Sequence, residues 1–265
     1  MKGRVLVIAG SDSGGGAGIQ ADIKTITALD GFAMTAVTAL TAQNSLGVAN
    51  VHKPPPAFVA EQIRVTLQDL GADAIKTGMM ADAPIIEAAA DALDALAPSI
   101  PWVIDPVMVS TARDRLLDED AVQSMITRLI VRAAVVTPNM MEAEVLTGLA
   151  VTTPDEMAAA GKALLAMGAG AALVTGGHLE GEAICDVLVR PGGVERFESQ
   201  RISTPHTHGT GCTLASAIAC GLAQGLGLPD AVVRARAYVC EAIRTAPGYG
   251  GGHGPLNHAH TVKLF

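Results

Sequence analysis

The sequence predicts an α/β fold, with a central, mostly parallel β-sheet covered by helices on both faces in a three-layer arrangement. Short apolar runs alternate along the chain with longer amphipathic stretches, the strand–helix alternation of parallel sheets. The strand runs are apolar throughout, which is typical of strands buried on both faces. Hydrophobic residues make up 49% of the chain but aromatic residues only 3%, which indicates a core of small aliphatic side chains.

The predicted strands are short runs of aliphatic residues bounded by glycine or polar residues. They are Val5–Ala9, Thr35–Leu40, Ala74–Thr77, Trp102–Ile104, Ala134–Thr137, Ala171–Val174 and Ile184–Val189. The segment 186–202 carries Pro191, Gly192 and Gly193 at its centre and therefore predicts a hairpin, which would form an antiparallel edge.

The predicted helices show apolar residues at helical spacing. They are Ile19–Leu29, Ala57–Leu70, Ala83–Leu96, Glu119–Leu129, Glu142–Leu146, Pro154–Met167, Cys212–Ala223 and Ala231–Arg244. The sequence KPPPAF at 53–58 is typical of a helix start, and no linker or repeat interrupts the pattern. We therefore expect one domain over residues 1–265.

Composition excludes several classes of function. The net charge is −8 and lysine and arginine are not clustered, so nucleic acid is not an expected partner. No apolar stretch is long enough to span a membrane, and the one near the N-terminus is too short for a signal peptide. The four cysteines form no CxxC pair, which is typical of reduced thiols. We expect a cytoplasmic protein without membrane contact.

The glycine-rich stretch SDSGGGAGIQ follows the first predicted strand and precedes a helix. Its glycines miss the G-x-G-x-x-G spacing because Ile19 occupies the last glycine position, and GADAIKT at 71–77 lacks the glycine before the lysine of a P-loop. Neither a dinucleotide site nor a Walker site is predicted. The loop still lies at the carboxyl end of a strand, where open α/β sheets bind ligands.

Three further strand ends carry polar residues. Asp105 follows the strand 102–104, Asn139 follows the strand 134–137, and Thr175 and Gly177 follow the strand 171–174. Glu142 lies in the first turn of the next helix, where it either completes a capping box with Asn139 or reaches a metal-bound water. Two carboxylates beside a glycine-lined anion site favour magnesium-assisted phosphoryl transfer.

Cys212 lies where the glycine-containing turn THGTG becomes an apolar helix. Backbone amides at a helix start bind anions and lower the pKa of a thiol. Two interpretations remain open from this stretch alone: a small apolar residue packing a helix start, or a catalytic base. The seven histidines show no metal-ligand spacing, so we interpret them as solvated or structural and the glycine-rich segment GYGGGHGPLNHAH as a surface loop.

Taken together, AGSDSGGGAGIQADIKT, TALTAQNSLGV, IKTGMM, DPVMVS, TPNMMEAEVLTG, GGHL, THGTGCTLASAIA and GHGPLNH resemble the bacterial hydroxymethylpyrimidine/phosphomethylpyrimidine kinases of thiamin biosynthesis, in the ribokinase-like superfamily. The resemblance covers nearly the whole chain. It implies two successive ATP-dependent phosphorylations of 4-amino-5-hydroxymethyl-2-methylpyrimidine, with Mg²⁺ and a homodimeric assembly.

The resemblance also implies roles for individual residues. Gln43 reads the pyrimidine edge with Asp22 nearby, and Met79 and Val107 line the pocket. Asp105 and Glu142 organise Mg-ATP, while Asn139, Thr175 and Gly177 belong to the nucleotide side. Gly209, Thr210 and Gly211 form the anion hole, and Cys212 is the base.

The chain departs from its relatives on the presumed nucleotide side. Thr175 replaces a lysine, Arg113 lies in a divergent stretch 110–117, and Pro205 and His206 replace a Lys-Asn pair. We expect altered nucleotide affinity or donor preference. A pyridoxal kinase and a non-catalytic ligand-binding protein remain the alternative functions.

Overall fold

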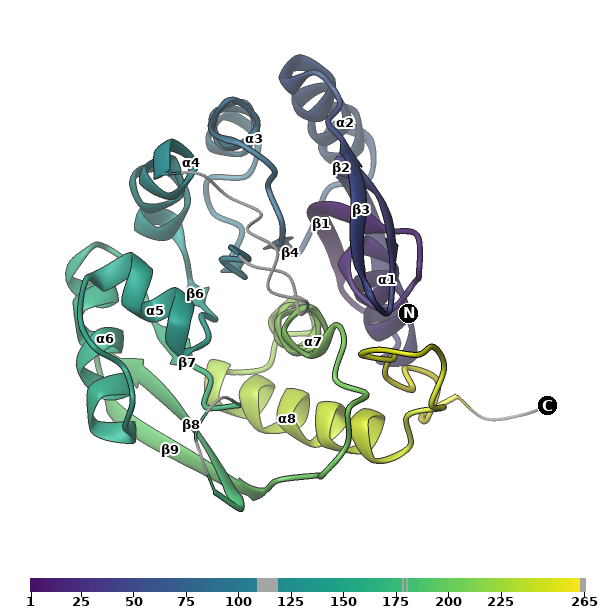
Figure 1. Cartoon of the computed structure of the whole chain (residues 1–265). Coiled ribbons are helices and arrows are strands. Elements are labelled where there is room, and N and C mark those ends of the chain that lie inside the picture. The colour runs from purple at the N-terminus through teal and green to yellow at the C-terminus, as the bar shows by residue number, and fades with distance from the viewer. Residues whose placement is uncertain (109–118, 178, 180, 263–265) are drawn as a thin grey trace.

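The computed structural model describes residues 1–108, 119–177, 179 and 181–262. One sheet of nine strands passes through these residues in the order β3-β2-β1-β4-β5-β6-β7-β8-β9 (Figure 1). The strands are β1 (Arg4–Asp12), β2 (Phe32–Asn44), β3 (Gly47–His52), β4 (Ala74–Thr77), β5 (Trp102–Ile104), β6 (Val135–Val136), β7 (Ala172–Val174), β8 (Ala183–Arg190) and β9 (Gly193–Gln200). Strands β2, β1, β4, β5, β6 and β7 are parallel, whereas β3, β8 and β9 pair antiparallel at the two edges.

Helices cover both faces of the sheet, which confirms the predicted three layers (Figure 1). The helices are α1 (Gly18–Ala28), α2 (Pro56–Asp69), α3 (Ala83–Leu96), α4 (Glu119–Ser124), α5 (Met140–Thr147), α6 (Pro154–Ala166), α7 (Thr210–Ala223) and α8 (Leu228–Arg244). Alternate residues of each central strand point to opposite faces. Leu6 and Ile8 of β1 therefore pack toward α2 and α3, and Val5 and Val7 pack toward α7 and α8.

The structure differs from the prediction in one helix and in one additional strand. The expected helix 119–129 is α-helical only to Ser124 and continues as a π-helical turn over Met125–Leu129. Strand β3 was not predicted because most of its side chains are exposed, so it carries no hydrophobic period. The predicted hairpin around Gly192 is confirmed as β8 and β9.

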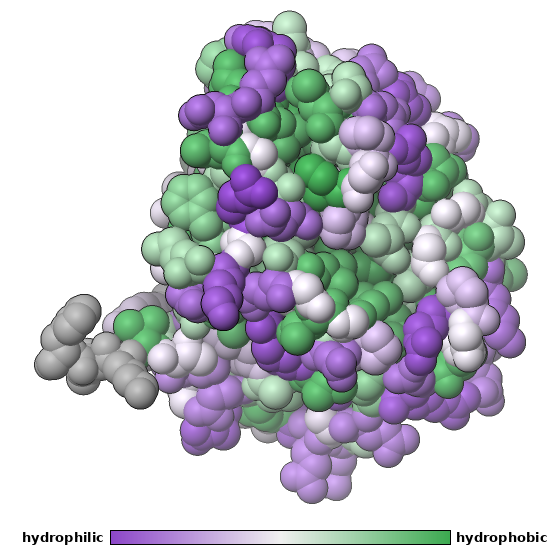
Figure 2. All heavy atoms as spheres, turned by 180° about the vertical axis from the view of Figure 1, so that it is seen from behind, coloured by the Kyte–Doolittle hydropathy of each residue, from purple (hydrophilic) through white to green (hydrophobic). Residues whose placement is uncertain are grey.

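The outer surface carries polar and apolar side chains together. Seen from behind, polar side chains are interspersed with apolar ones (Figure 2), as on most protein surfaces. None of the helices in the described part of the chain is both long and apolar enough to cross a membrane. The four cysteines are unpaired.

The carboxyl ends of the parallel strands meet at one edge of the sheet. Asp12 ends β1, and Asp105, Thr137 and Thr175 follow β5, β6 and β7. Because open α/β sheets bind ligands at this edge, we expect the functional site there.

Candidate active site

A cavity of about 650 Å³ opens at this edge of the sheet, a size suited to small-molecule ligands. It brings together twelve of the thirteen site residues predicted from the sequence, drawn from β2, the strand ends and α7. They are Gln43, Met79, Val107, Asp105, Asn139, Glu142, Thr175, Gly177, Gly209, Thr210, Gly211 and Cys212. The thirteenth, Asp22, is fully buried outside the lining, so it does not contact a ligand in the cavity directly.

The turn before α7 is shaped by a glycine that no other residue can replace without strain. Gly209 has φ 84°, and a Cβ there would lie 1.9 Å from the carbonyl oxygen of Gly16. This conformation starts α7 at Thr210 and places the amides of Gly211 and Cys212 in its first turn, where no helical acceptor exists. The turn therefore offers an anion-binding helix start at the cavity wall.

Cys212 faces the same cavity, but its thiol is not ionised as readily as the sequence suggested. Burial raises the pKa of Cys212 to about 12, although the charge of Lys76 opposes the shift. The predicted easy ionisation is therefore wrong for the structure described, because desolvation of the thiolate outweighs the favourable helix start. The Asp105 carboxylate interacts with this thiol, and the interaction favours the ionised form of Asp105.

A fully buried lysine lies beneath this group, and sequence reasoning missed it. Nζ of Lys76 lies 3.0 Å from Oδ1 of Asp22 and 3.7 Å from Oδ2 of Asp105. Ser216 on α7 donates to Asp22 over 2.6 Å. Burial disfavours the charged amine, but the negative charges around it, that of Asp22 first, outweigh burial and raise the pKa of Lys76. Asp22 therefore contacts Lys76, which in turn lies beside Asp105 in the cavity wall. A lysine within an otherwise apolar strand could have indicated this buried ion pair from the sequence.

Asp105 and Glu142 form a carboxylate pair in the cavity wall. Their side chains are nearly inaccessible, and Asp105 Oδ2 has no hydrogen-bond partner among the described residues. Burial raises the pKa of Asp105 to about 6 against the charge of Lys76. Burial, followed by the charge of Asp105, raises the pKa of Glu142 to about 8. A cation bound between these two carboxyl groups would favour the ionised form of both, so the pair is suited to bind one.

Glu142 also satisfies the capping interpretation. Its Oε2 accepts from the Asn139 amide over 2.9 Å, and Oδ1 of Asn139 accepts from the Glu142 amide over 2.9 Å. The predicted capping box and the predicted position at the cavity are therefore both present.

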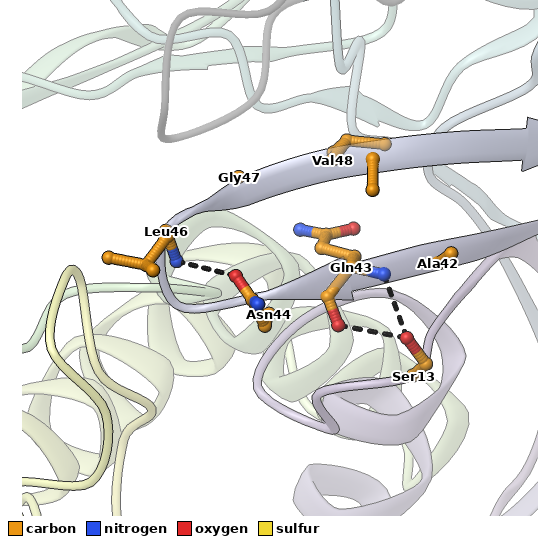
Figure 3. Close-up of a pocket in the computed structure, with 8 residues that line it drawn as sticks. Ser13, Ala42, Gln43, Asn44, Leu46, Gly47 and Val48 are labelled. Carbon is orange, nitrogen blue, oxygen red and sulfur yellow. Dashed lines mark hydrogen bonds between the residues drawn. The ribbon is translucent and has the colours of Figure 1, made fainter.

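At the other end of the cavity, Ser13 in the loop after β1 holds the backbone of Gln43. Oγ of Ser13 donates to the backbone carbonyl of Gln43 and accepts from its backbone N–H, both at 2.8 Å (Figure 3). The β2–β3 pairing shifts register between Ala42 and Gln43, as at a bulge. Figure 3 shows the side-chain amide of Gln43 between the two strands of this hairpin, near Val48.

Asp12 and His208 lie beside Gln43 and were not predicted as site residues. Oδ2 of Asp12 lies 2.8 Å from Nε2 of His208, although the two residues are far apart in sequence. Burial alone would raise the pKa of Asp12, but hydrogen bonds from His208, Ala17 and Gly14 outweigh it and lower that pKa. Only the fold brings these two residues together, because one histidine gives no spacing signal.

The loop after β7 is held by charged residues that were also missed. Asp186 on β8 accepts from the Gly176 amide over 2.8 Å and from Nε of Arg236 over 2.7 Å. Nε and a terminal nitrogen of Arg201 each donate over 2.9 Å to the carbonyls of Gly181 and Gly177. Both arginines line the cavity near Thr175. Arg113, the other cation considered for this region, lies outside the described residues.

Among the histidines outside the cavity, His258 has a structural role, which is one of the two interpretations that the sequence allowed. Its Nε2 lies 3.0 Å from Oγ1 of Thr213, and burial lowers its pKa to about 4. The segment predicted as a surface loop is instead partly buried at Gly254, Leu256 and His258. Within the part of the chain that the structure describes, no three acidic, histidine or cysteine side chains form a metal site of their own.

The chain matches a family model described as phosphomethylpyrimidine kinase over residues 12–257. It is 47% identical over 97% of its length to a thiamine biosynthesis bifunctional protein of Geobacter sulfurreducens, of which it spans 52%. It is 46% identical to a hydroxymethylpyrimidine/phosphomethylpyrimidine kinase of Streptomyces coelicolor, covering 96% of this chain and 93% of the relative. A structure of Bacillus subtilis pyridoxal kinase in complex with ADP is 35% identical with a TM-score of 0.88, covering 98% of both chains.

Proposed function

The chain belongs to the phosphomethylpyrimidine kinase family, and from that premise we propose how its cavity performs the reaction. The protein is a hydroxymethylpyrimidine/phosphomethylpyrimidine kinase of thiamine biosynthesis with a ribokinase-like fold. ATP phosphorylates the hydroxymethyl oxygen of the pyrimidine, and a second phosphoryl transfer converts the monophosphate into the diphosphate. Each transfer forms one P–O bond, breaks the bond between the γ-phosphorus and its bridging oxygen, and releases ADP.

The observation that carries the mechanism is the meeting of Cys212, Asp105 and the amides of the Gly209–Cys212 turn in one cavity. The amides stabilise the negative charge of the phosphoryl group in transit. Sγ of Cys212 takes the proton of the attacking hydroxyl, while the proton of the thiol passes to a non-bridging oxygen of the phosphoryl group as that group is transferred.

Cys212 serves the first transfer more than the second. An alcohol carries a proton that must leave, whereas a phosphate monoester loses its second proton near pH 6 without help. We therefore place the cysteine in the alcohol step, while the amides at the start of α7 serve both steps.

Asp105 and Glu142 fit a hydrated Mg²⁺. This ion is typically held by one or two carboxylates, with water and phosphate oxygens completing its shell. The buried Oδ2 of Asp105 without a hydrogen-bond partner and the raised pKa of Glu142 support this assignment. Bound there, Mg²⁺ would neutralise charge on the phosphates of ATP.

Gln43, Met79 and Val107 lie in the cavity wall as the pyrimidine site requires, and Asn139, Thr175 and Gly177 lie where we place the nucleotide. Thr175 supplies no charge to phosphate, but Arg201 and Arg236 are close enough to line the same cavity. We propose that they alter nucleotide affinity or donor preference. A comparison of phosphate donors with the pyrimidine alcohol tests this, and an affinity for ATP like that of lysine-containing relatives would refute it.

Phosphorylation of a pyridine alcohol is the second candidate function, because the structural similarity to pyridoxal kinase extends over almost the entire chain. Side-by-side kinetics with the pyrimidine and pyridine alcohols separates the two.

We also propose a homodimer, because the apolar side chains of Leu46, Val51 and Phe58 are exposed on and beside the β2–β3 hairpin. Light scattering tests that assembly.

The decisive experiment for the function is mass analysis of the products formed from 4-amino-5-hydroxymethyl-2-methylpyrimidine, ATP and Mg²⁺. We expect the monophosphate first and the diphosphate later. ATP consumption without either product would contradict the proposed chemistry and would leave a ligand-binding role.

A further inference from the structure

We propose that His258 is a positioning residue that holds the anion-binding turn before α7 in the geometry used for phosphoryl transfer. It acts through Thr213, which follows Cys212 in α7. The proposal rests on the proposed function, in which the amides of this turn stabilise the transferred phosphoryl group. It assigns a role in both transfers to the C-terminal segment 253–260, whose residues lie outside the cavity lining.

Thr213 fixes the carbonyl group of the glycine that shapes the turn. The Gly209 carbonyl accepts a hydrogen bond from the Thr213 backbone N–H over 2.9 Å and another from the Thr213 hydroxyl over 2.8 Å. A carbonyl and the amide that follows it share one rigid plane, so two bonds to the carbonyl fix the peptide that leads into α7. The amides of Gly211 and Cys212, which have no helical acceptor, follow directly after this peptide.

His258 in turn fixes the Thr213 hydroxyl. Nε2 of His258 lies 3.0 Å from Oγ1 of Thr213, and both side chains are buried. The hydroxyl has one hydrogen, and it is donated to the Gly209 carbonyl, which can only accept. Nε2 must therefore carry a hydrogen and donate it to a lone pair of Oγ1. Each hydrogen in this chain of bonds from His258 to Gly209 is used once.

The charge state of His258 agrees with this assignment. Burial lowers the pKa of His258 to about 4, so the ring is neutral near neutral pH and carries a single hydrogen on its nitrogens. The bond to Thr213 places that hydrogen on Nε2.

The segment that carries His258 is itself anchored. The Tyr238 hydroxyl on α8 donates to the His258 carbonyl over 2.7 Å. The His208 amide, directly before the turn, donates to the Gly254 carbonyl over 3.2 Å. The His258 ring therefore reaches α7 from a segment that is held against α8 and against the chain entering the turn.

The chain contains a similar arrangement away from the cavity, which provides a matched control. At the end of α8, the Thr245 hydroxyl donates to the Glu241 carbonyl over 2.7 Å, and Nδ2 of Asn257 donates to Oγ1 of Thr245 over 3.2 Å. Both arrangements join the C-terminal segment to a helix through a threonine hydroxyl, but Thr245 does not line the cavity. A purely structural role of the segment would affect both arrangements alike.

Removal of the His258 donor should act on the turn amides. The buried Oγ1 of Thr213 would lose its donor, and with it the contact that holds the hydroxyl toward Gly209. Stabilisation of a transferred group depends on amides that already point at it. Because these amides serve both transfers, both transfers should slow.

The test compares His258→Ala with the parent in separate assays of the pyrimidine alcohol and of its monophosphate, with saturating ATP and Mg²⁺. We expect kcat to fall about tenfold or more for both substrates. The Kd of the alcohol in calorimetry should change less than about threefold, because its binding places no phosphoryl group on the turn. The stoichiometry of that titration counts the folded sites.

Four further variants separate positioning from structural support. His258→Gln keeps a side-chain N–H that can donate to Thr213 and should recover part of kcat. Thr213→Val removes the hydroxyl with little change in shape and should slow both transfers. Thr245→Val and His260→Ala remove contacts of the same segment with α8 and should keep the parental kcat.

The proposal is overturned if folded His258→Ala keeps the parental kcat for the monophosphate. A loss that His260→Ala or Thr245→Val reproduces, or that His258→Gln does not reduce, also overturns it, because packing of the segment then explains the loss. If His258→Ala does not fold, an unchanged kcat in Thr213→Val overturns it. A parent that binds the alcohol but forms no phosphate ester contradicts the proposed function and this proposal with it. An active parent with equally active variants contradicts only the role of His258.

Discussion

Asp12 and Asp105 both lie at the carboxyl ends of parallel strands and line one cavity, yet their surroundings are opposite. Asp12 accepts hydrogen bonds from three backbone amides and pairs with His208, and its pKa is lowered. Asp105 has a buried oxygen without a hydrogen-bond partner among the described residues, and burial raises its pKa. At the Asp12 end, hydrogen bonds from the protein itself satisfy the carboxylate. At the Asp105 end, the carboxylate is left to interact with the charges of bound ligands.

The largest effect should come from the residue beside Asp105. Cys212→Ala should slow phosphorylation of the alcohol by about 10²–10⁴-fold, the usual contribution of a general base. Phosphorylation of the monophosphate should fall much less, because its phosphate needs no cysteine to remove a proton. Separate assays with the two substrates check this, and equal losses would contradict the division of roles.

The buried ammonium group of Lys76, which lies beneath the cavity between Asp22 and Asp105, should contribute strongly to the stability of the fold. Lys76→Met leaves Asp22 and Asp105 without their cation and should cost about 3–5 kcal/mol of unfolding free energy. The matched control Lys53→Met removes a surface pair with Asp82 and should cost less than about 1 kcal/mol. Urea denaturation of both variants measures the difference. Similar losses would mean that the buried network is not needed for stability.

A smaller, pH-dependent effect should distinguish Glu142. A carboxyl group whose pKa is higher in the folded than in the unfolded chain stabilises the fold at low pH. That contribution is lost as pH rises through the folded pKa, here about 8. Glu142→Gln should therefore gain in Tm relative to the parent between pH 5 and pH 9, by several degrees.

Glu156→Gln is the matched control, since Glu156 holds the same capping position on α6. Hydrogen bonds from Thr152 lower the pKa of Glu156, so its substitution should give no such gain above pH 6. A Tm difference for Glu142→Gln that does not change with pH would show that its carboxyl group is not held protonated.

The sequence was sufficient for the elements that bury apolar residues and for the residues at strand ends. Those strand ends meet at one edge in any parallel sheet, so Asp105, Asn139 and Thr175 could be placed together before the structure was known. The exposed strand β3 could not, because it lacks a hydrophobic period.

The parts of the site that depend on tertiary contacts were beyond sequence reasoning. The pairing of Asp12 with His208 joins β1 to the turn before α7 and leaves no trace in local spacing. The pKa of Cys212 was predicted in the wrong direction because the helix start is local, whereas the desolvation that outweighs it comes from the whole fold.

The contrast between the two ends of the cavity is tested most directly by counting protons on ligand binding. Calorimetry of Mg-ADP and of the pyrimidine alcohol at pH 7.5, in buffers of different ionisation enthalpy, gives that count. We predict proton release with Mg-ADP, because a cation lowers the raised pKa of Glu142, and almost none with the pyrimidine. No release with Mg-ADP, or equal release with both ligands, would contradict the account.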